Sequence, residues 1–210
     1  MNKTISLLDY GVGNLCSVMN AFEHLGVRVI ATNNQDEICS SSGIVIPGVG
    51  AFGSAMDGMK KYGLDGVVQD MARLGKPILG ICVGFQMLMA SSFEMGVHEG
   101  LNFFMLRVEK IPTSERLPHI GWSNLYVENG EESKSILLRG IENPRFYFLH
   151  SYAPIEMESN FSFSTSTNYG GCKFISLVER GNIFGTQFHP EKSGECGLAL
   201  LKNFSDYALG

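Results

Sequence analysis

The segment Gly80-Ile81-Cys82-Val83-Gly84 constrains the fold of this chain more than any other part of the sequence. It follows an apolar run that starts at Ile78 and precedes helix-favouring residues such as Gln86 and Met87. A cysteine flanked in this way by glycines, between a strand and a helix, has the spacing of a nucleophile elbow. The glycines are needed because so tight a turn leaves no room for a Cβ atom. By itself, however, the pattern would also fit a structural cysteine in a buried strand.

The same turn predicts how such a thiol is activated. A thiol at the start of a helix lies near the positive end of the helix dipole, which favours the thiolate over the thiol. The backbone N–H of Val83, the next residue, would then be placed to bind a developing oxyanion.

Segments with the patterns of strands and helices alternate through the first half of the chain. Apart from the run that leads to Cys82, the predicted strands are 4–10, 27–31 and 43–46, and the predicted helices are 15–25 and 54–73. This alternation predicts an α/β fold with a doubly wound, mostly parallel central sheet. Because ligands bind at the carboxyl ends of the strands in such sheets, the 10–14 and 47–53 loops should face the same crevice as Cys82.

The second half has shorter predicted strands, at 103–111, 120–127, 145–149, 161–167, 173–178 and 182–187, followed by a helix over 194–208. These strands predict a largely antiparallel extension of the central sheet. No repeat or linker interrupts the sequence, so we expect one domain over residues 1–210.

Composition argues against several classes of function. The net charge is −5 and lysine and arginine form no run, which argues against a nucleic-acid partner. No apolar run is long enough to span a membrane, and the five cysteines show neither zinc-ligand nor disulfide-framework spacing. Neither glycine-rich turn completes a nucleotide-binding motif. We therefore expect a cytoplasmic protein that needs no metal or other cofactor.

A second motif supplies a base for the thiol. His189-Pro190-Glu191 follows a predicted strand, and two residues that are two apart in an extended segment share a face. A glutamate can accept a hydrogen bond from one imidazole nitrogen and leave the other free to take a proton from a thiol. Together with the cysteine elbow, this motif predicts a Cys82-His189-Glu191 triad.

Several motifs resemble those of a known enzyme family. The residues around Cys82 and the sequence 187–191 resemble the two signatures of class I, triad-type glutamine amidotransferases. Four further motifs, at 9–14, 47–52, 118–122 and 146–152, are similar to those of the glutaminase subunits of imidazole glycerol phosphate synthases. The resemblance covers about residues 6–204 and implies a flavodoxin-like class I glutamine amidotransferase fold.

The resemblance also implies an activity and a set of site residues. The Cys82 thiolate would attack the side-chain amide of L-glutamine, and water would hydrolyse the resulting thioester to glutamate. The ammonia would pass to a cyclase subunit, a (β/α)₈ barrel bound as a heterodimer, in histidine biosynthesis. By motif match, the oxyanion hole would comprise Gly48, Val49, Gly50 and Val83. The substrate would be bound by Gln86, Glu94, His150, Ser151 and Tyr152. The partner interface would contain Asn14, Trp122, Tyr147 and Lys192.

Other interpretations stay open at the level of the sequence. Ser123 stands where this family usually has asparagine, and the elbow has Val83 and Phe85 where leucine and methionine are commoner. These departures leave room for a paralogous glutaminase whose barrel partner amidinates a cell-surface sugar. A Cys-His-Glu peptidase and a non-catalytic interaction subunit are the remaining alternatives. Without the resemblance, Gln86 and Glu94 would be read as helix surface and Trp122 as core.

Overall fold

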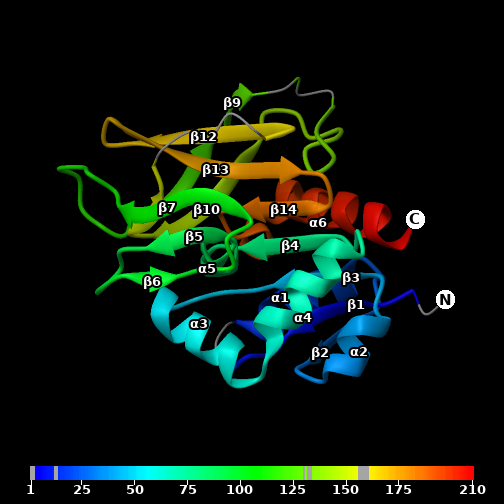
Figure 1. Ribbon diagram of the computed structural model, residues 1–210. Helices are drawn as coiled ribbons and strands as arrows, with labels where there is room; N and C mark the ends of the chain where they lie inside the picture. Colours follow the sequence, from blue (N-terminus) through cyan, green and yellow to red (C-terminus); the bar gives the residue numbers. More distant parts are fainter. Residues whose placement is uncertain (1–2, 12–13, 130, 132–133, 156–160) are drawn as a thin grey trace.

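The computed structural model describes residues 3–11, 14–129, 131, 134–155 and 161–210. Its centre is an eight-stranded sheet with the order β2-β1-β3-β4-β14-β13-β12-β9 (Figure 1). The first five strands in this order are parallel, and the remaining three are antiparallel. The strands are β1 (Ile5–Leu8), β2 (Val29–Thr32), β3 (Gly43–Ile46), β4 (Ile78–Ile81), β9 (Tyr126–Asn129), β12 (Phe163–Tyr169), β13 (Cys172–Arg180) and β14 (Ile183–Thr186). The predicted fold class is confirmed.

The helices fall into two groups by their mutual contacts. Helix α1 contacts α6, whereas α4 contacts both α2 and α3, and α3 contacts α5. They are α1 (Leu15–His24), α2 (Gln35–Ser40), α3 (Phe52–Lys61), α4 (Leu64–Arg73), α5 (Val83–Met87) and α6 (Gly194–Leu209), with a 3-10 helix η2 (Pro190–Lys192) before α6. Among the described residues, each helix is too short or too polar to cross a bilayer.

Two smaller sheets lie beside the central one. Strands β8 (His119–Asn124) and β10 (Arg145–His150) form an antiparallel pair, and a four-stranded sheet has the order β11-β7-β5-β6 (Figure 1). Its strands are β5 (Met89–Ser92), β6 (His98–Glu99), β7 (Phe104–Lys110) and β11 (Tyr152–Pro154). The predicted strands 103–111 and 145–149 thus correspond to β7 and β10, which lie outside the central sheet, and 120–127 covers β8 and the start of β9. The antiparallel extension of the central sheet consists of β13, β12 and β9.

Two sequence-based boundaries differ from the structure. The predicted helix 54–73 is two helices, because Gly63 lies between them in the left-handed conformation with a φ of 65°. Helix α2 was not predicted; its N-cap is the Asn34 side chain, which accepts hydrogen bonds from two backbone N–H groups. Residues 12 and 13 of the predicted 10–14 loop lie outside the described residues.

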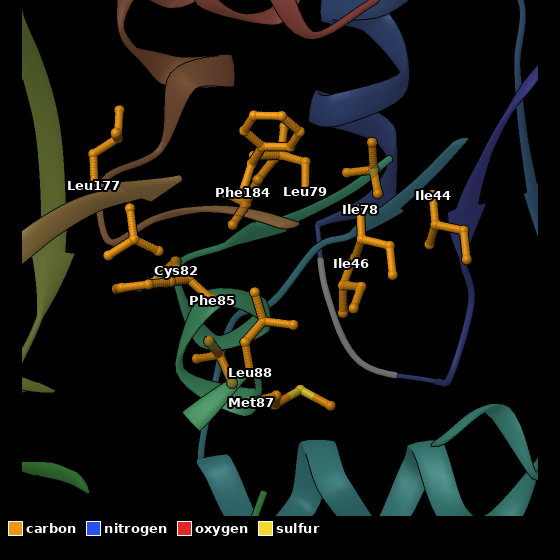
Figure 2. Close-up of a cluster of buried hydrophobic side chains, with 14 of the residues drawn as sticks. Ile44, Ile46, Ile78, Leu79, Cys82, Phe85, Met87, Leu88, Leu177 and Phe184 are labelled. Atoms are coloured by element: carbon orange, nitrogen blue, oxygen red, sulfur yellow. The ribbon is translucent and has the colours of Figure 1, made fainter. Parts of the chain in front are cut away.

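The position of β14 decides where the site forms. The sequence placed 182–187 in the antiparallel part, but β14 lies parallel to β4, with Thr186 opposite Ile81. The residues that follow these two strands therefore emerge side by side at the same edge of the sheet. Figure 2 shows Cys82 within a cluster of buried side chains, near Phe85, and Phe184 and Leu79 belong to the same core.

Candidate active site

Cys82 lies in a strained turn between β4 and α5, with a φ of 53° and a ψ of −108°. A non-glycine residue with positive φ is costly and is found preferentially at functional sites. The flanking glycines make this turn possible. A Cβ atom on Gly84 would overlap the carbonyl oxygen of Ile46, and one on Gly80 would lie 2.7 Å from the carbonyl oxygen of Gly84. The elbow predicted from the sequence is therefore present.

His189 and Glu191 form a buried pair beside the thiol. His189 Nδ1 lies 2.8 Å from Glu191 Oε1, and each side chain is only 2% exposed. The sequence analysis assumed that this segment is extended, and that assumption was wrong. Pro190 begins the 3-10 helix η2 directly after His189. The tight turn still brings the carboxylate to the imidazole. The structure thus places the three predicted catalytic residues together.

The electrostatics of this group favour a charged imidazole. Burial by itself lowers the pKa of His189, but the Cys82 thiolate, its hydrogen bond and the Glu191 carboxylate together raise that pKa from 6.5 to about 10. The imidazolium is therefore the favoured state of His189, with the carboxylate on one side of the ring and the sulfur of Cys82 on the other. An imidazolium in this position supplies a proton donor next to a nucleophile.

The backbone of His189 is fixed by strand β10 and by Ser193. Its N–H donates to the carbonyl oxygen of Tyr147 at 2.9 Å. The Ser193 hydroxyl donates to the carbonyl oxygen of His189 at 2.6 Å and accepts from the N–H of Tyr147 at 2.9 Å. Both backbone groups of the histidine are therefore held, which limits its movement relative to β10.

A cavity of about 120 Å³ opens onto the thiol and the imidazole. Its lining contains every residue that the sequence assigned to the substrate: Gln86, Glu94, His150, Ser151 and Tyr152. Val49, Gly50 and Val83, three of the four predicted oxyanion-hole residues, line it as well. The fourth, Gly48, packs on the elbow, because a Cβ atom there would overlap the backbone nitrogen of Gly84.

Gln86 is not on the helix surface, which the pattern of α5 by itself would predict. Its side-chain N–H groups donate to the carbonyl oxygen of Tyr152 at 2.8 Å and to Gln187 Oε1 at 3.1 Å. Only its Oε1 acceptor is left for a ligand. Glu94 accepts a hydrogen bond of 2.7 Å from the N–H of Phe52, so it joins the cavity to the start of α3.

Two residues near the thiol were missed by the sequence analysis. Gln187 Nε2 lies 3.8 Å from Cys82 Sγ, within hydrogen-bonding range for sulfur. It belongs to the quoted 187–191 motif, and its spacing of two from His189 was the available signal. Buried Tyr10 donates its hydroxyl to the carbonyl oxygen of Pro47, and burial together with the Cys82 charge raises the pKa of Tyr10. It anchors the start of the 47–53 loop.

The predicted interface residues lie on adjoining elements. Trp122 is 46% exposed, so it is not a core residue, and its ring lies 6.1 Å from that of Tyr147 on the neighbouring strand. Lys192 is exposed in η2, which contacts both β10 and α1. Asn14, at the start of α1, donates to the Ser17 hydroxyl at 2.6 Å.

The thiol cavity is not the largest one. A cavity of about 890 Å³ lies between residues 124–127 and 138–144, and the residues that line it include neither cysteine nor histidine. It therefore offers none of the nucleophilic chemistry described above. Among the described residues, no cluster of histidine, cysteine and carboxylate side chains is arranged to hold a metal ion.

Comparison with known proteins agrees with this geometry. The family model of class-I glutamine amidotransferases matches residues 6–206. Imidazole glycerol phosphate synthase subunit HisH of Oceanobacillus iheyensis is 40% identical over 202 residues, which are 96% of this chain and 98% of that protein. The protein of the same name from Methanosarcina barkeri is 43% identical over 208 residues, 97% of this chain and 98% of the relative.

Solved structures share the fold at lower identity. A crystal structure of a glutamine amidotransferase superposes with a TM-score of 0.75 at 17% identity, covering 97% of this chain and 98% of the other. The PurLQS structure from Thermotoga maritima gives a TM-score of 0.74 at 21% identity and 99% coverage of both chains. The chain therefore belongs to the class-I glutamine amidotransferase family and, within it, to the family of HisH subunits of imidazole glycerol phosphate synthase.

Proposed function

We propose that this chain is the glutaminase subunit of an imidazole glycerol phosphate synthase and hydrolyses L-glutamine to glutamate and ammonia for histidine biosynthesis. The observation that carries the proposal is the buried 2.8 Å contact between His189 and Glu191 beside the strained Cys82 elbow. A thiolate paired with an oriented imidazolium is what nucleophilic cleavage of an amide requires.

In the first half of the reaction, the Cys82 thiolate attacks the side-chain carbonyl carbon of glutamine. The carbon–sulfur bond forms as the carbonyl becomes an oxyanion. The His189 imidazolium then gives its proton to the amide nitrogen, the carbon–nitrogen bond breaks, and ammonia leaves. A γ-glutamyl thioester and a neutral imidazole remain, the latter held in position by Glu191.

In the second half, His189 acts as the base. It takes a proton from a water molecule, whose oxygen attacks the thioester carbon. Collapse of the second oxyanion breaks the carbon–sulfur bond and restores the thiolate beside the imidazolium. The product leaves as the γ-carboxylic acid, which loses its proton to solvent and becomes glutamate. Because the imidazolium is the stable state in this environment, the cycle ends where it began.

The oxyanion hole is assigned to the N–H of Val83 and to the Gly48-Val49-Gly50 loop. Val83 begins α5, and the first N–H groups of a helix have no partner within the helix. Gly50 has a φ of 92°, which a residue with a side chain would adopt only with strain. Recognition of glutamine is assigned to Gln86, Glu94 and the 150–152 segment, which line the cavity.

The partner is proposed to be a cyclase subunit with a (β/α)₈ barrel, bound as a heterodimer. The relatives are named as subunits of a synthase, which supports a second subunit here. Strands β8 and β10 alternate between buried and outward side chains, and Ile120, Trp122 and Leu149 on the outward side are at least 36% exposed. An apolar outward face rimmed by Lys192 suits a protein partner.

The other interpretations have less support. The relatives are named as subunits of the histidine-pathway enzyme, which favours that pathway over a sugar-amidinating partner. A peptidase would need room for a chain on both sides of the thiol, whereas the cavity is only about 120 Å³. A non-catalytic role would not explain why Cys82 adopts a strained backbone conformation with positive φ, which is found preferentially at functional sites.

The test measures glutamate release by the protein mixed with an imidazole glycerol phosphate synthase cyclase subunit, with and without its ribulosyl nucleotide substrate. We expect strong stimulation by the subunit and nucleotide together. Cys82→Ala should abolish glutamine-dependent turnover, while the complex still uses free ammonium. Glutamate release that survives this substitution would refute the assignment of the nucleophile. Slow activity that the cyclase subunit does not stimulate would instead favour the sugar-amidinating partner.

A further inference from the structure

A pair of buried histidines lies at the cavity and transfers no proton in the reaction described above. His119 is on β8 and His150 is on β10, where the two residues lie directly opposite each other. They are 2% and 6% exposed, and His119 Nδ1 lies 3.4 Å from His150 Nε2. His150 lines the thiol cavity, whereas His119 does not.

The directions of the hydrogen bonds in this pair follow from one carbonyl group. His150 Nδ1 lies 2.9 Å from the carbonyl oxygen of Tyr152, which can only accept, so Nδ1 carries the proton. In the neutral ring, Nε2 of His150 is then an acceptor, and His119 must donate from Nδ1. Nε2 of His119 accepts in turn from the Ser123 hydroxyl at 3.1 Å. A single tautomer of each ring satisfies all three contacts.

Both rings are neutral at physiological pH. Burial lowers the pKa of His119 to about 4. Burial is also the main cause that lowers the pKa of His150 to about 3, with smaller contributions from His119 and His189. His150 is therefore a hydrogen-bonding group and not a second base.

Aromatic neighbours hold the plane of the His119 ring. It stacks on Tyr169 with centroids 4.2 Å apart and on Phe148 with centroids 5.1 Å apart, at interplanar angles of 25° and 21°. The ring is therefore held with its Nδ1 edge toward His150. A stacked, buried ring with both nitrogens engaged is well suited to fix the orientation of its neighbour.

The chain of contacts continues to the thiol. The carbonyl oxygen of Tyr152 accepts from His150 and also from Gln86 Nε2, at 2.8 Å. Gln86 then donates to Gln187, whose Nε2 lies 3.8 Å from Cys82 Sγ. The orientation of these two amides is thus linked, contact by contact, to the state of the histidine pair.

We propose that His119 is a positioning residue for glutamine binding: its Nδ1–H donates to Nε2 of His150 and so holds the ring that donates to the Tyr152 carbonyl, which also accepts from the Gln86 amide at the cavity. This inference rests on the proposed glutaminase function. It also gives Ser123 a role, because its hydroxyl contacts Nε2 of His119, the nitrogen that accepts when Nδ1 donates to His150. Without the donor from His119, Nε2 of His150 is a buried acceptor that has lost this hydrogen bond, which destabilises the present orientation of the His150 ring.

The experiment compares two reagents for Cys82 in the full-length protein. A diazoketone analogue of L-glutamine must bind the cavity before it alkylates the thiol, whereas iodoacetamide needs only the thiolate. His119→Phe keeps the ring stacking and removes the donor. We expect it to lower the labelling rate by the analogue about tenfold and to leave the iodoacetamide rate nearly unchanged. In the complex with a cyclase subunit, the KM for glutamine should rise more than kcat falls.

Two further variants separate positioning from general damage. His119→Asn retains an N–H near the position of Nδ1 and should restore most of the labelling by the analogue. Thr165→Val removes a buried hydroxyl that contacts Ser176 at 2.9 Å outside this chain of contacts, and it should change neither rate. Melting temperatures of all variants control for folding.

The outcomes are distinct. An unchanged rate with the analogue in His119→Phe overturns the proposal, and so does an equal fall with both reagents, which would indicate general damage to the site. A failure of the asparagine variant to recover above the phenylalanine variant also counts against it. If the wild-type protein does not react with the analogue even when a cyclase subunit and its nucleotide substrate are present, the proposed glutaminase function fails, and this inference fails with it.

Discussion

The role of Glu191 gives the sharpest quantitative prediction. Its Oε1 atom accepts the hydrogen bond from His189 Nδ1 at 2.8 Å, and both side chains are almost fully buried. Glu191→Gln keeps an acceptor of the same shape and removes the charge. A hydrogen bond with a charged partner contributes about 1.5–3 kcal/mol, against about 0.5–1.5 kcal/mol for a neutral one, so the imidazolium should lose about 1–2 kcal/mol of stabilisation. Coulomb attraction between unit charges about 4 Å apart, at an effective dielectric constant near 20, is of the same order, about 4 kcal/mol.

This loss should appear in two measurements. The pKa of His189, which its partners raise to about 10, should fall by about one pH unit, as followed by NMR titration of isotope-labelled histidine side chains. Glutamine-dependent kcat in the complex should fall about 5- to 30-fold. Glu195→Gln is the matched control, because it makes the same charge change at an exposed position in the first turn of α6.

A His189 pKa that does not move in Glu191→Gln would refute the reasoning, because the carboxylate would then not stabilise the imidazolium. A fall in kcat with an unchanged pKa would mean that Glu191 acts by orienting the ring and not by its charge. An equal change in Glu195→Gln would point to a long-range effect of net charge, which the buried contact with His189 does not predict.

The remaining predictions concern stability and association. A pKa of His189 raised from 6.5 to about 10 stabilises the fold fully below pH 6.5, and this contribution should be lost as pH rises through 10, as urea unfolding at several pH values would show. Gly84→Ala should destabilise the protein by about 3 kcal/mol, because its Cβ atom would overlap the carbonyl of Ile46. Gly66 lies in α4 with open space around the position of a Cβ atom, so Gly66→Ala should stabilise the protein by about 0.5–1 kcal/mol in the same unfolding assay. Trp122→Ala should weaken binding of the cyclase subunit by about 2 kcal/mol in calorimetry without altering Cys82 alkylation, and Tyr126→Ala, another exposed aromatic residue, should have no such effect.

The sequence by itself determined the chemistry and the fold class. The glycines on both sides of Cys82 could be interpreted from the sequence alone, because a tight turn excludes Cβ atoms whatever surrounds it. His189 and Glu191 are only two residues apart, so their contact is local and could be predicted even though the segment proved to be a 3-10 helix. The alternation of strands and helices likewise reflects periodicities that short windows of sequence contain.

Contacts between distant segments were decided only by the tertiary structure. Residues 182–187 read as one more short strand, and only the packing beside β4 showed that this strand is parallel and carries His189 to Cys82. Gln86 and Gln187 are 101 residues apart, and no local pattern indicates that their amides meet. The same holds for His119 and His150, since a buried pair of neutral histidines has no sequence signature: their contact depends on the register of β8 against β10. Local sterics and spacing specify the reactive groups, whereas strand order and register decide which distant side chains orient them.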